Sequence, residues 1–259
     1  MKYVIYLFLL LPCSISAQKT IETSFIKKTD FKASQIVTID NFGTKYFISN
    51  NVFNKKGIDR TITYNNLQLG NITTANAFNP LKINLFYKDF NSVIILDNRL
   101  AEIFKIDFNT LPDYKNVSHV STGHDNTIWI FNENNQKLEL FDYRSLTTRA
   151  QTVPIQSIVL DLKSNYNFCY LLTKNYLYTY NYFGSLIKRI KNNGHTQLSE
   201  SNGDIFLKKE NALVYLKKGT ETIIPILIPN LLINAFFVTN ETLYIYANEI
   251  LHEYKIKID

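Results

Sequence analysis

Residues 126–143, NTIWIFNENNQKLELFDY, combine an apolar run, an Asn-rich turn and a second run that ends in an aromatic residue. Short runs rich in aromatic and β-branched residues, separated by turn-forming residues, are typical of β-strands. The same kind of pattern fills the chain from residue 18 onward, and no stretch shows a sustained helical period with caps. The quoted stretch therefore predicts a β-hairpin, and the rest of the chain predicts an all-β protein.

The hairpin pattern recurs in degenerate form to give six segments. These segments begin at Gly43, Asn91, Asn126, Asn167, Gly203 and Glu241. Successive starts lie 48, 35, 41, 36 and 38 residues apart, which averages close to forty. Repeats of about 40 to 50 residues are typical of β-propeller blades.

Each hairpin has flanking runs, so the repeating unit is predicted to have four strands. The upstream runs are residues 34–39, 81–87, 117–121, 155–162, 195–199 and 231–238. The downstream runs are 61–65, 149–153, 186–191 and 221–226, with a poorly defined run at 109–114. The sixth unit lacks a downstream run, whereas residues 20–25 form a spare strand at the start. This offset predicts a ring in which the first strand completes the last blade beside residues 250–256 and removes open sheet edges.

The repeats resemble a six-bladed β-propeller of four-stranded antiparallel blades, similar in shape to the NHL and TolB-like propellers. The resemblance is to an architecture, because the sequence lacks the WD and GH dipeptides and a clean NHL motif. Residues 93–96 and 128–131 are apolar at every position, as expected when both faces of a blade pack on its neighbours. The quoted hairpin should then supply the second and third strands of the third blade.

The long interval between the first two segments is assigned to residues 67–80, which include Phe78. We expect an inter-blade loop that projects from one face of the ring. Such loops often carry binding residues. They also tolerate insertions that have no function, so both interpretations stay open.

The first 17 residues predict a secretory signal peptide, because Lys2 precedes an apolar segment and mostly small residues follow it. We expect residues 18–259 to form one propeller domain, exported from a Bacteroidota-type cell to the periplasm, the outer-membrane periphery or the exterior. No later stretch is long and uncharged enough to span a membrane. Pro12 argues against lipidation of Cys13, and Cys169 lies in an apolar run that predicts a buried, inert thiol.

The charge pattern excludes some classes of function. The formal net charge is +6, but the basic residues lie in short dispersed groups such as Lys55-Lys56. Nucleic-acid binding calls for a basic stripe, so we expect none. Motifs for phosphate loops, nucleophile elbows, zinc proteases and dinucleotide sites do not occur. We therefore expect no cofactor and favour a protein that is not an enzyme.

His124 and Asp125 are candidate binding residues, and the nearby His119 raises the question of a metal site. Residues 119 and 124 point to opposite faces of an extended strand unless Gly123 reorients one of them, so we expect no metal there. Acidic and amide residues recur at the corresponding points of the other units, at Asp40, Asp89, Asn165, Asp204 and Glu241. We assign them to tight turns, although a ring of carboxylates around the axis would also suit a cation or a polar ligand.

Aromatic residues form a second candidate surface. Tyr176, Tyr178, Tyr180 and Tyr182 alternate along the chain and so share one face of a predicted strand. That face either packs between blades or forms an exposed strip suited to a glycan or to the edge of a partner protein. Trp129, the only tryptophan, lies inside an apolar run, and we expect it in the core.

Three functions fit these observations. The favoured one is a monomeric, exported interaction scaffold that binds protein partners at the cell envelope. It is similar in kind to the propeller subunit of the outer-membrane β-barrel assembly machinery. The second is a ligand binder, hydrolase or lyase that uses His124 and Asp125 at the mouth of the central channel. The third is a glycan-binding module that uses the tyrosine strip.

Overall fold

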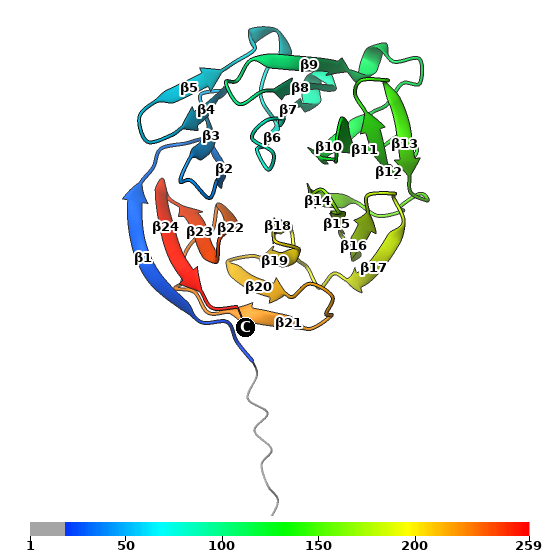
Figure 1. Ribbon diagram of the computed structural model, residues 1–259. Helices are drawn as coiled ribbons and strands as arrows, with labels where there is room; N and C mark the ends of the chain where they lie inside the picture. Colours follow the sequence, from blue (N-terminus) through cyan, green and yellow to red (C-terminus); the bar gives the residue numbers. More distant parts are fainter. Residues whose placement is uncertain (1–18, 259) are drawn as a thin grey trace, which may run out of the picture.

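The computed structural model describes residues 19–258, which form six four-stranded antiparallel sheets arranged as blades around a central axis (Figure 1). In five of the sheets the strand order follows the chain, with the first strand innermost and the fourth at the rim. The predicted all-β class and six-bladed propeller are confirmed. The signal peptide predicted for residues 1–17 lies outside the described residues.

The six blades follow one another around the ring in chain order. Blade 1 contains β2 (Gln35–Ile39), β3 (Lys45–Ser49), β4 (Val52–Lys56) and β5 (Thr61–Tyr64). Blade 2 contains β6 (Thr74–Asn76), β7 (Ile83–Tyr87), β8 (Ser92–Leu96) and β9 (Glu102–Asp107). Blade 3 contains β10 (Val117–Thr122), β11 (Thr127–Asn132), β12 (Lys137–Asp142) and β13 (Thr147–Gln151).

The second half of the ring is built in the same way. Blade 4 contains β14 (Val159–Ser164), β15 (Phe168–Thr173), β16 (Tyr176–Asn181) and β17 (Leu186–Lys191). Blade 5 contains β18 (Gln197–Ser201), β19 (Asp204–Lys209), β20 (Ala212–Leu216) and β21 (Ile223–Ile226). Blade 6 contains β22 (Ala235–Thr239), β23 (Thr242–Ala247), β24 (Ile250–Ile256) and β1 (Thr23–Asp30). Within residues 19–258, three short 3-10 helices lie between strands: η2 (Leu67–Leu69), η3 (Lys88–Phe90) and η4 (Phe108–Thr110).

The hairpin quoted first is β11–β12. It forms the second and third strands of blade 3, as predicted. Ile130 pairs with Glu139, and Asn132 pairs with Lys137 at the end of the ladder, so residues 133–136 form the turn.

Six hydrophobic clusters stabilise the ring, one between each pair of adjacent blades. Trp129 and Leu140 of blade 3 meet Cys169 and Leu171 of blade 4 in one of them. The predicted core positions of Trp129 and Cys169 are therefore confirmed, and burial raises the pKa of the Cys169 thiol. Burying each large aliphatic side chain contributes about 1.5–3 kcal/mol, so a blade is stabilised mainly by its two neighbours.

Blade 6 combines the two ends of the described chain. β1 pairs antiparallel with β24, with Thr23 opposite Ile256 and Asp30 opposite Ile250. A bulge interrupts the pairing at Ile26, and Ile21 forms a parallel bridge to Ile226 of blade 5. The strand expected at residues 20–25 thus begins three residues later and extends to Asp30.

Blade 2 departs from the sequence prediction. The expected inter-blade loop at residues 67–80 contains the first strand of the blade, β6. Residues 81–87 therefore supply the second strand and not the first, and residues 109–114 begin within η4 and form no strand. The cause is the composition of β6, Thr-Ala-Asn, because three small or polar residues provide no apolar run to detect. Phe78 accordingly lies within the blade, in the turn between β6 and β7.

Candidate functional site

One end of the ring carries most of the sequence candidates. Neighbouring strands run antiparallel, so the turns between first and second strands and between third and fourth strands lie at the same end of every blade. This end includes residues 77–82 of blade 2, 123–126 of blade 3, and 165–167 and 182–185 of blade 4. We call it the aromatic end.

Five rings at this end, in two contact groups, form what we call the aromatic cluster: Phe78 with Tyr166, and His124 with Tyr182 and Phe183. The ring centroids of Phe78 and Tyr166 lie 5.0 Å apart, those of His124 and Tyr182 lie 5.3 Å apart, and those of Tyr182 and Phe183 lie 4.0 Å apart. The contact of Phe78 with Tyr166 joins blade 2 to blade 4, which are not neighbours in the ring. All the rings except that of His124 are exposed.

His124 is positioned by a tight turn. A Cβ atom on Gly123 would lie 2.3 Å from the Thr127 hydroxyl, so only glycine fits before His124. Thr127 closes the turn through donation of its backbone N–H to the His124 carbonyl at 3.0 Å. The Nδ1 atom of His124 is buried and has no hydrogen-bond partner among the described residues.

Asp125 contributes its backbone to the turn. It is exposed and adopts a φ of 52°, and its carbonyl accepts a hydrogen bond from Lys82 of blade 2. The same ammonium group lies 3.4 Å from the side-chain oxygen of Asn126. Lys82 therefore ties the turns of blades 2 and 3 together beneath the aromatic cluster.

A chain of uncharged polar side chains links the inner strands at this end. Asn76 of β6 donates to the Ser121 hydroxyl of β10 at 3.2 Å and accepts from the Thr122 hydroxyl at 3.0 Å. Ser164 of β14 donates to Ser121 at 2.8 Å. These bonds fix the inner edges of blades 2, 3 and 4 relative to one another, so the aromatic cluster has a rigid base.

The tyrosine strip divides into two parts. Tyr176, Tyr178 and Tyr180 share one face of β16, with neighbouring ring centroids 5.8 and 6.0 Å apart. Tyr180 is buried in the core between blades 3 and 4, whereas Tyr176 and Tyr178 are half-buried. Tyr182 lies beyond the end of β16, and its ring contacts His124.

A groove of about 480 Å³ opens between blades 3 and 4. It is lined by residues 151–157, which lead out of blade 3, and by Asn175, Tyr176, Tyr178, Tyr180, Gly184, Leu186 and Arg189 of blade 4. The Arg189 guanidinium lies 4.7 Å above the Tyr176 ring in a cation–π contact. His124, Asp125 and Phe78 do not line this groove.

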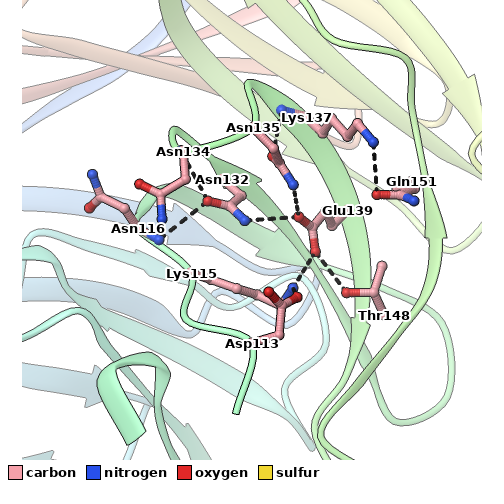
Figure 2. Close-up of polar contacts among 10 residues, drawn as sticks. All are labelled: Asp113, Lys115, Asn116, Asn132, Asn134, Asn135, Lys137, Glu139, Thr148 and Gln151. Carbon is pink, nitrogen blue, oxygen red and sulfur yellow. Dashed lines mark hydrogen bonds and ion pairs between the residues drawn. The ribbon is translucent and has the colours of Figure 1, made fainter. Parts of the chain in front are cut away.

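Figure 2 shows a buried ion pair that the sequence did not reveal. Lys115, in the connection from blade 2 to blade 3, lies 2.9 Å from the Glu139 carboxylate of β12, and the two side chains are 5% and 1% exposed. Asn132, Asn135 and Thr148 donate the remaining hydrogen bonds to Glu139 at 2.7–3.0 Å. Asp113 provides a second carboxylate for Lys115 at 2.8 Å. This network is fully satisfied, so it seals the interface of blades 2 and 3.

Among the recurring acidic and amide candidates, Asp40 and Asn165 serve their own turns. Asp204 accepts hydrogen bonds from the Tyr215 hydroxyl and the Lys218 backbone N–H, and Glu241 pairs with Lys255. Asp40 accepts hydrogen bonds at 2.9 Å from the backbone N–H groups of Phe42 and Thr44, and Asn165 bonds in the same way within its own turn. Asp89 lies in η3, between the second and third strands, so it belongs to the opposite end of the ring and not to the series proposed from the sequence.

Metal ligands are not grouped within residues 19–258, where no three His, Cys, Asp or Glu side chains could hold an ion together. His119 lies on β10 with Nδ1 3.0 Å from the Ser118 hydroxyl, and burial lowers its pKa. It does not contact His124 through any described interaction. The helices of the described region are also too short and polar to cross a membrane.

The propeller architecture is shared with solved structures of very different sequence. A virginiamycin B lyase from Staphylococcus aureus matches with a TM-score of 0.62 and 11% identity, covering 90% of this chain and 99% of that one. A streptogramin B lyase matches with a TM-score of 0.64 and 12% identity, covering 92% of this chain and 88% of that one. A chain of a mitotic checkpoint complex matches with a TM-score of 0.61 and 10% identity, covering 93% and 94%.

These likenesses define the class, a β-propeller, and at such low identity they show the fold alone. No family model matches this sequence, and no curated protein matches it.

Proposed function

We propose that this chain is an exported, non-enzymatic β-propeller that binds a protein partner at the bacterial cell envelope through the aromatic cluster. The observation that carries the proposal is the exposure of Phe78, Tyr166, Tyr182 and Phe183 together at one end of the ring. Exposed aromatic residues on a rigid base are typical of the centres of protein interfaces, where a few such anchors supply most of the binding energy.

The rigidity of this surface supports the proposal. The cluster draws on three blades whose inner strands are joined by Asn76, Ser121 and Ser164, so the rings are held before a partner arrives. A pre-ordered surface loses little conformational entropy on binding. Export and envelope location rest on the residues before 18, and a protein partner at that location suits a domain with an exposed aromatic end.

The test is capture of a partner from envelope fractions by the full chain and by two variants. Phe78→Ser/Tyr182→Ser/Phe183→Ser removes the cluster, whereas Leu67→Ser/Leu232→Ser removes two exposed side chains at the opposite end. We expect one specific envelope protein to be retained by the natural chain and the control, and reduced by about tenfold or more in the cluster variant, since each lost anchor costs about 1–2 kcal/mol. Equal capture by all three proteins, or no specific envelope protein at all, would refute the proposal.

A second candidate function is favoured by a single observation, the unpartnered Nδ1 atom of His124 beside the channel. A small ligand with a hydrogen-bonding group at the channel mouth would satisfy this atom. The side chain of Asp125 is exposed and makes no described contact that directs it to the same point, so this site would rest on His124. Imidazole ¹⁵N chemical shifts that stay unchanged across a library of polar metabolites would exclude it.

A further inference from the structure

The groove between blades 3 and 4 has a chemistry unlike that of the aromatic cluster. Its volume lies within the range of about 300–1,000 Å³ that is usual for small-ligand sites. Among its lining residues are three tyrosines, the amides of Gln151, Gln156 and Asn175, and the hydroxyls of Thr152 and Ser157. Aliphatic side chains form the minority, so the groove offers hydrogen bonds along with aromatic faces.

Several of these polar groups have no partner within the described chain. The hydroxyls of Tyr176 and Tyr178 and the side-chain amides of Gln156 and Asn175 make no hydrogen bond to any residue in the range 19–258. An apolar ligand would desolvate these groups without replacing their bonds to water, which costs about 1–3 kcal/mol for each group. The groove therefore favours a ligand that carries many hydroxyl groups.

Arg189 gives the groove a positive charge without a counter-charge. It has no carboxylate partner among the described residues, and none of the residues that line the groove is acidic. Arg149, by contrast, donates to Asp142 from Nε at 2.8 Å in the neighbouring blade. The cation–π contact with Tyr176 leaves the Arg189 N–H donors without a hydrogen bond to any described residue, and these donors match the two oxygens of a carboxylate.

We propose that this groove binds an acidic saccharide, a pyranose that carries a carboxylate. The carboxylate lies on the Arg189 guanidinium, and the sugar ring packs against the half-buried side chains of Tyr176 and Tyr178. The amides of Gln156 and Asn175 bond to the sugar hydroxyls. A neutral sugar would leave the charge of Arg189 unmatched, and an acidic peptide would leave most of the amides and phenols unmatched. The site does not depend on the protein partner proposed above.

The experiment is saturation-transfer NMR on the full chain with oligogalacturonate as the acidic probe and a malto-oligosaccharide of equal length as the neutral probe. We expect saturation transfer to oligogalacturonate and an affinity about tenfold or more above that for the neutral probe, as for a charge-assisted pair. Arg189→Gln should reduce the affinity for oligogalacturonate to that of the neutral probe. Arg144→Gln is the matched control, because Arg144 also stacks on a ring, that of Phe104 at 5.9 Å, but lies outside the groove.

Three results would overturn the proposal. Equal binding of the two probes would show that the charge of Arg189 does not contribute to binding. Equal binding by the natural chain and Arg189→Gln would show that the sugar binds outside the groove. A poly-glutamate peptide that binds more tightly than oligogalacturonate, with the same loss in Arg189→Gln, would assign the groove to a peptide. Matched thermal unfolding of all variants shows that a loss of binding is not a loss of folding.

Discussion

Blades 3 and 4 differ at one corresponding position, which is closed by a buried ion pair in blade 3 and lies beside a groove in blade 4. Glu139 of β12 pairs with Ile130, and Tyr178 of β16 pairs with Leu171, so the two residues occupy corresponding places on the face toward the preceding blade. In blade 3 the connection 108–116 places Lys115 against Glu139, and the two side chains fill the interface between blades 2 and 3. In blade 4 the connection 152–158 inserts Ile155 into the core and leaves Tyr178 beside an open groove.

The difference shows that the connection between blades, together with the residue that the blade supplies, decides whether this position is structural or available to a ligand. Both blades have the same strand order and ladder register. The residue at the position and the residue that arrives from the preceding connection both differ in kind. Glu139 meets the long cation of Lys115, whereas Tyr178 lies near the aliphatic side chain of Ile155.

Disruption of the Lys115–Glu139 pair should have the largest effect on stability. Lys115→Met leaves the Glu139 carboxylate buried without its cation, which should destabilise the protein by about 3–5 kcal/mol. Urea unfolding measures this change. The double variant Lys115→Met/Glu139→Leu replaces the pair with apolar groups and should recover most of the loss. A loss below about 1 kcal/mol in the single variant would mean that the pair does not seal the interface.

The contribution of the Lys115–Glu139 pair to stability should also depend on pH. Burial acts to raise the pKa of Glu139, but hydrogen bonds from Asn135, Lys115, Thr148 and Asn132 outweigh burial, so the pKa is lowered from 4.5. A lowered pKa in the folded state stabilises the protein above the unfolded-state value, and this stabilisation is lost as the pH falls through the folded-state pKa.

The measurement is the free energy of unfolding of the natural chain and of Glu139→Gln between pH 7 and pH 3. The natural chain should be more stable by about 1.5–3 kcal/mol at neutral pH, the usual contribution of charged hydrogen bonds. The difference should shrink once the pH falls below 4.5. Glu241→Gln is the control, because its carboxylate pairs with Lys255 at an exposed position. A difference that does not change with pH for Glu139→Gln would contradict the expected role of the charge.

Truncation of Tyr178 beside the groove should have the smallest effect on stability. Tyr178→Ala removes a half-buried ring and should cost about 1–2 kcal/mol, since the ring already contacts solvent in the groove. Tyr180→Ala provides the contrast, because Tyr180 is 3% exposed on the same face and should cost about 3–5 kcal/mol. Equal losses in urea unfolding would show that the groove is closed in solution.

The sequence predicted the fold wherever a strand was long and apolar. The β11–β12 hairpin was recognised because Ile128 to Phe131 form a continuous apolar run, and the six-fold repeat followed from it. The prediction failed in blade 2, where β6 has only three residues, Thr-Ala-Asn, and carries no hydrophobic signal. The spacing then shifted by one strand, so that Asp89 and Phe78 were assigned to the wrong connections.

The candidate site was less accessible from sequence than the fold. Phe78, His124 and Tyr182 were selected for chemical type, but their partners Tyr166 and Phe183 were not, because contacts between blades join residues with no sequence pattern in common. Lys115 and Glu139 were missed for the same reason, although a lone glutamate inside the run KLELFD was a detectable signal. The open groove depends on the path of the connection 152–158, which local sequence does not determine.

The pairing of β1 with β24 has a consequence for the timing of folding. Residues 23–30 are made before every other strand, and their partners at residues 250–256 are made last. Blades 1 to 5 can therefore assemble from local contacts during synthesis, while the sixth waits for a contact that spans nearly the whole chain. Contacts of such long range are slow to form. The first strand should remain unpaired until the last strand is made.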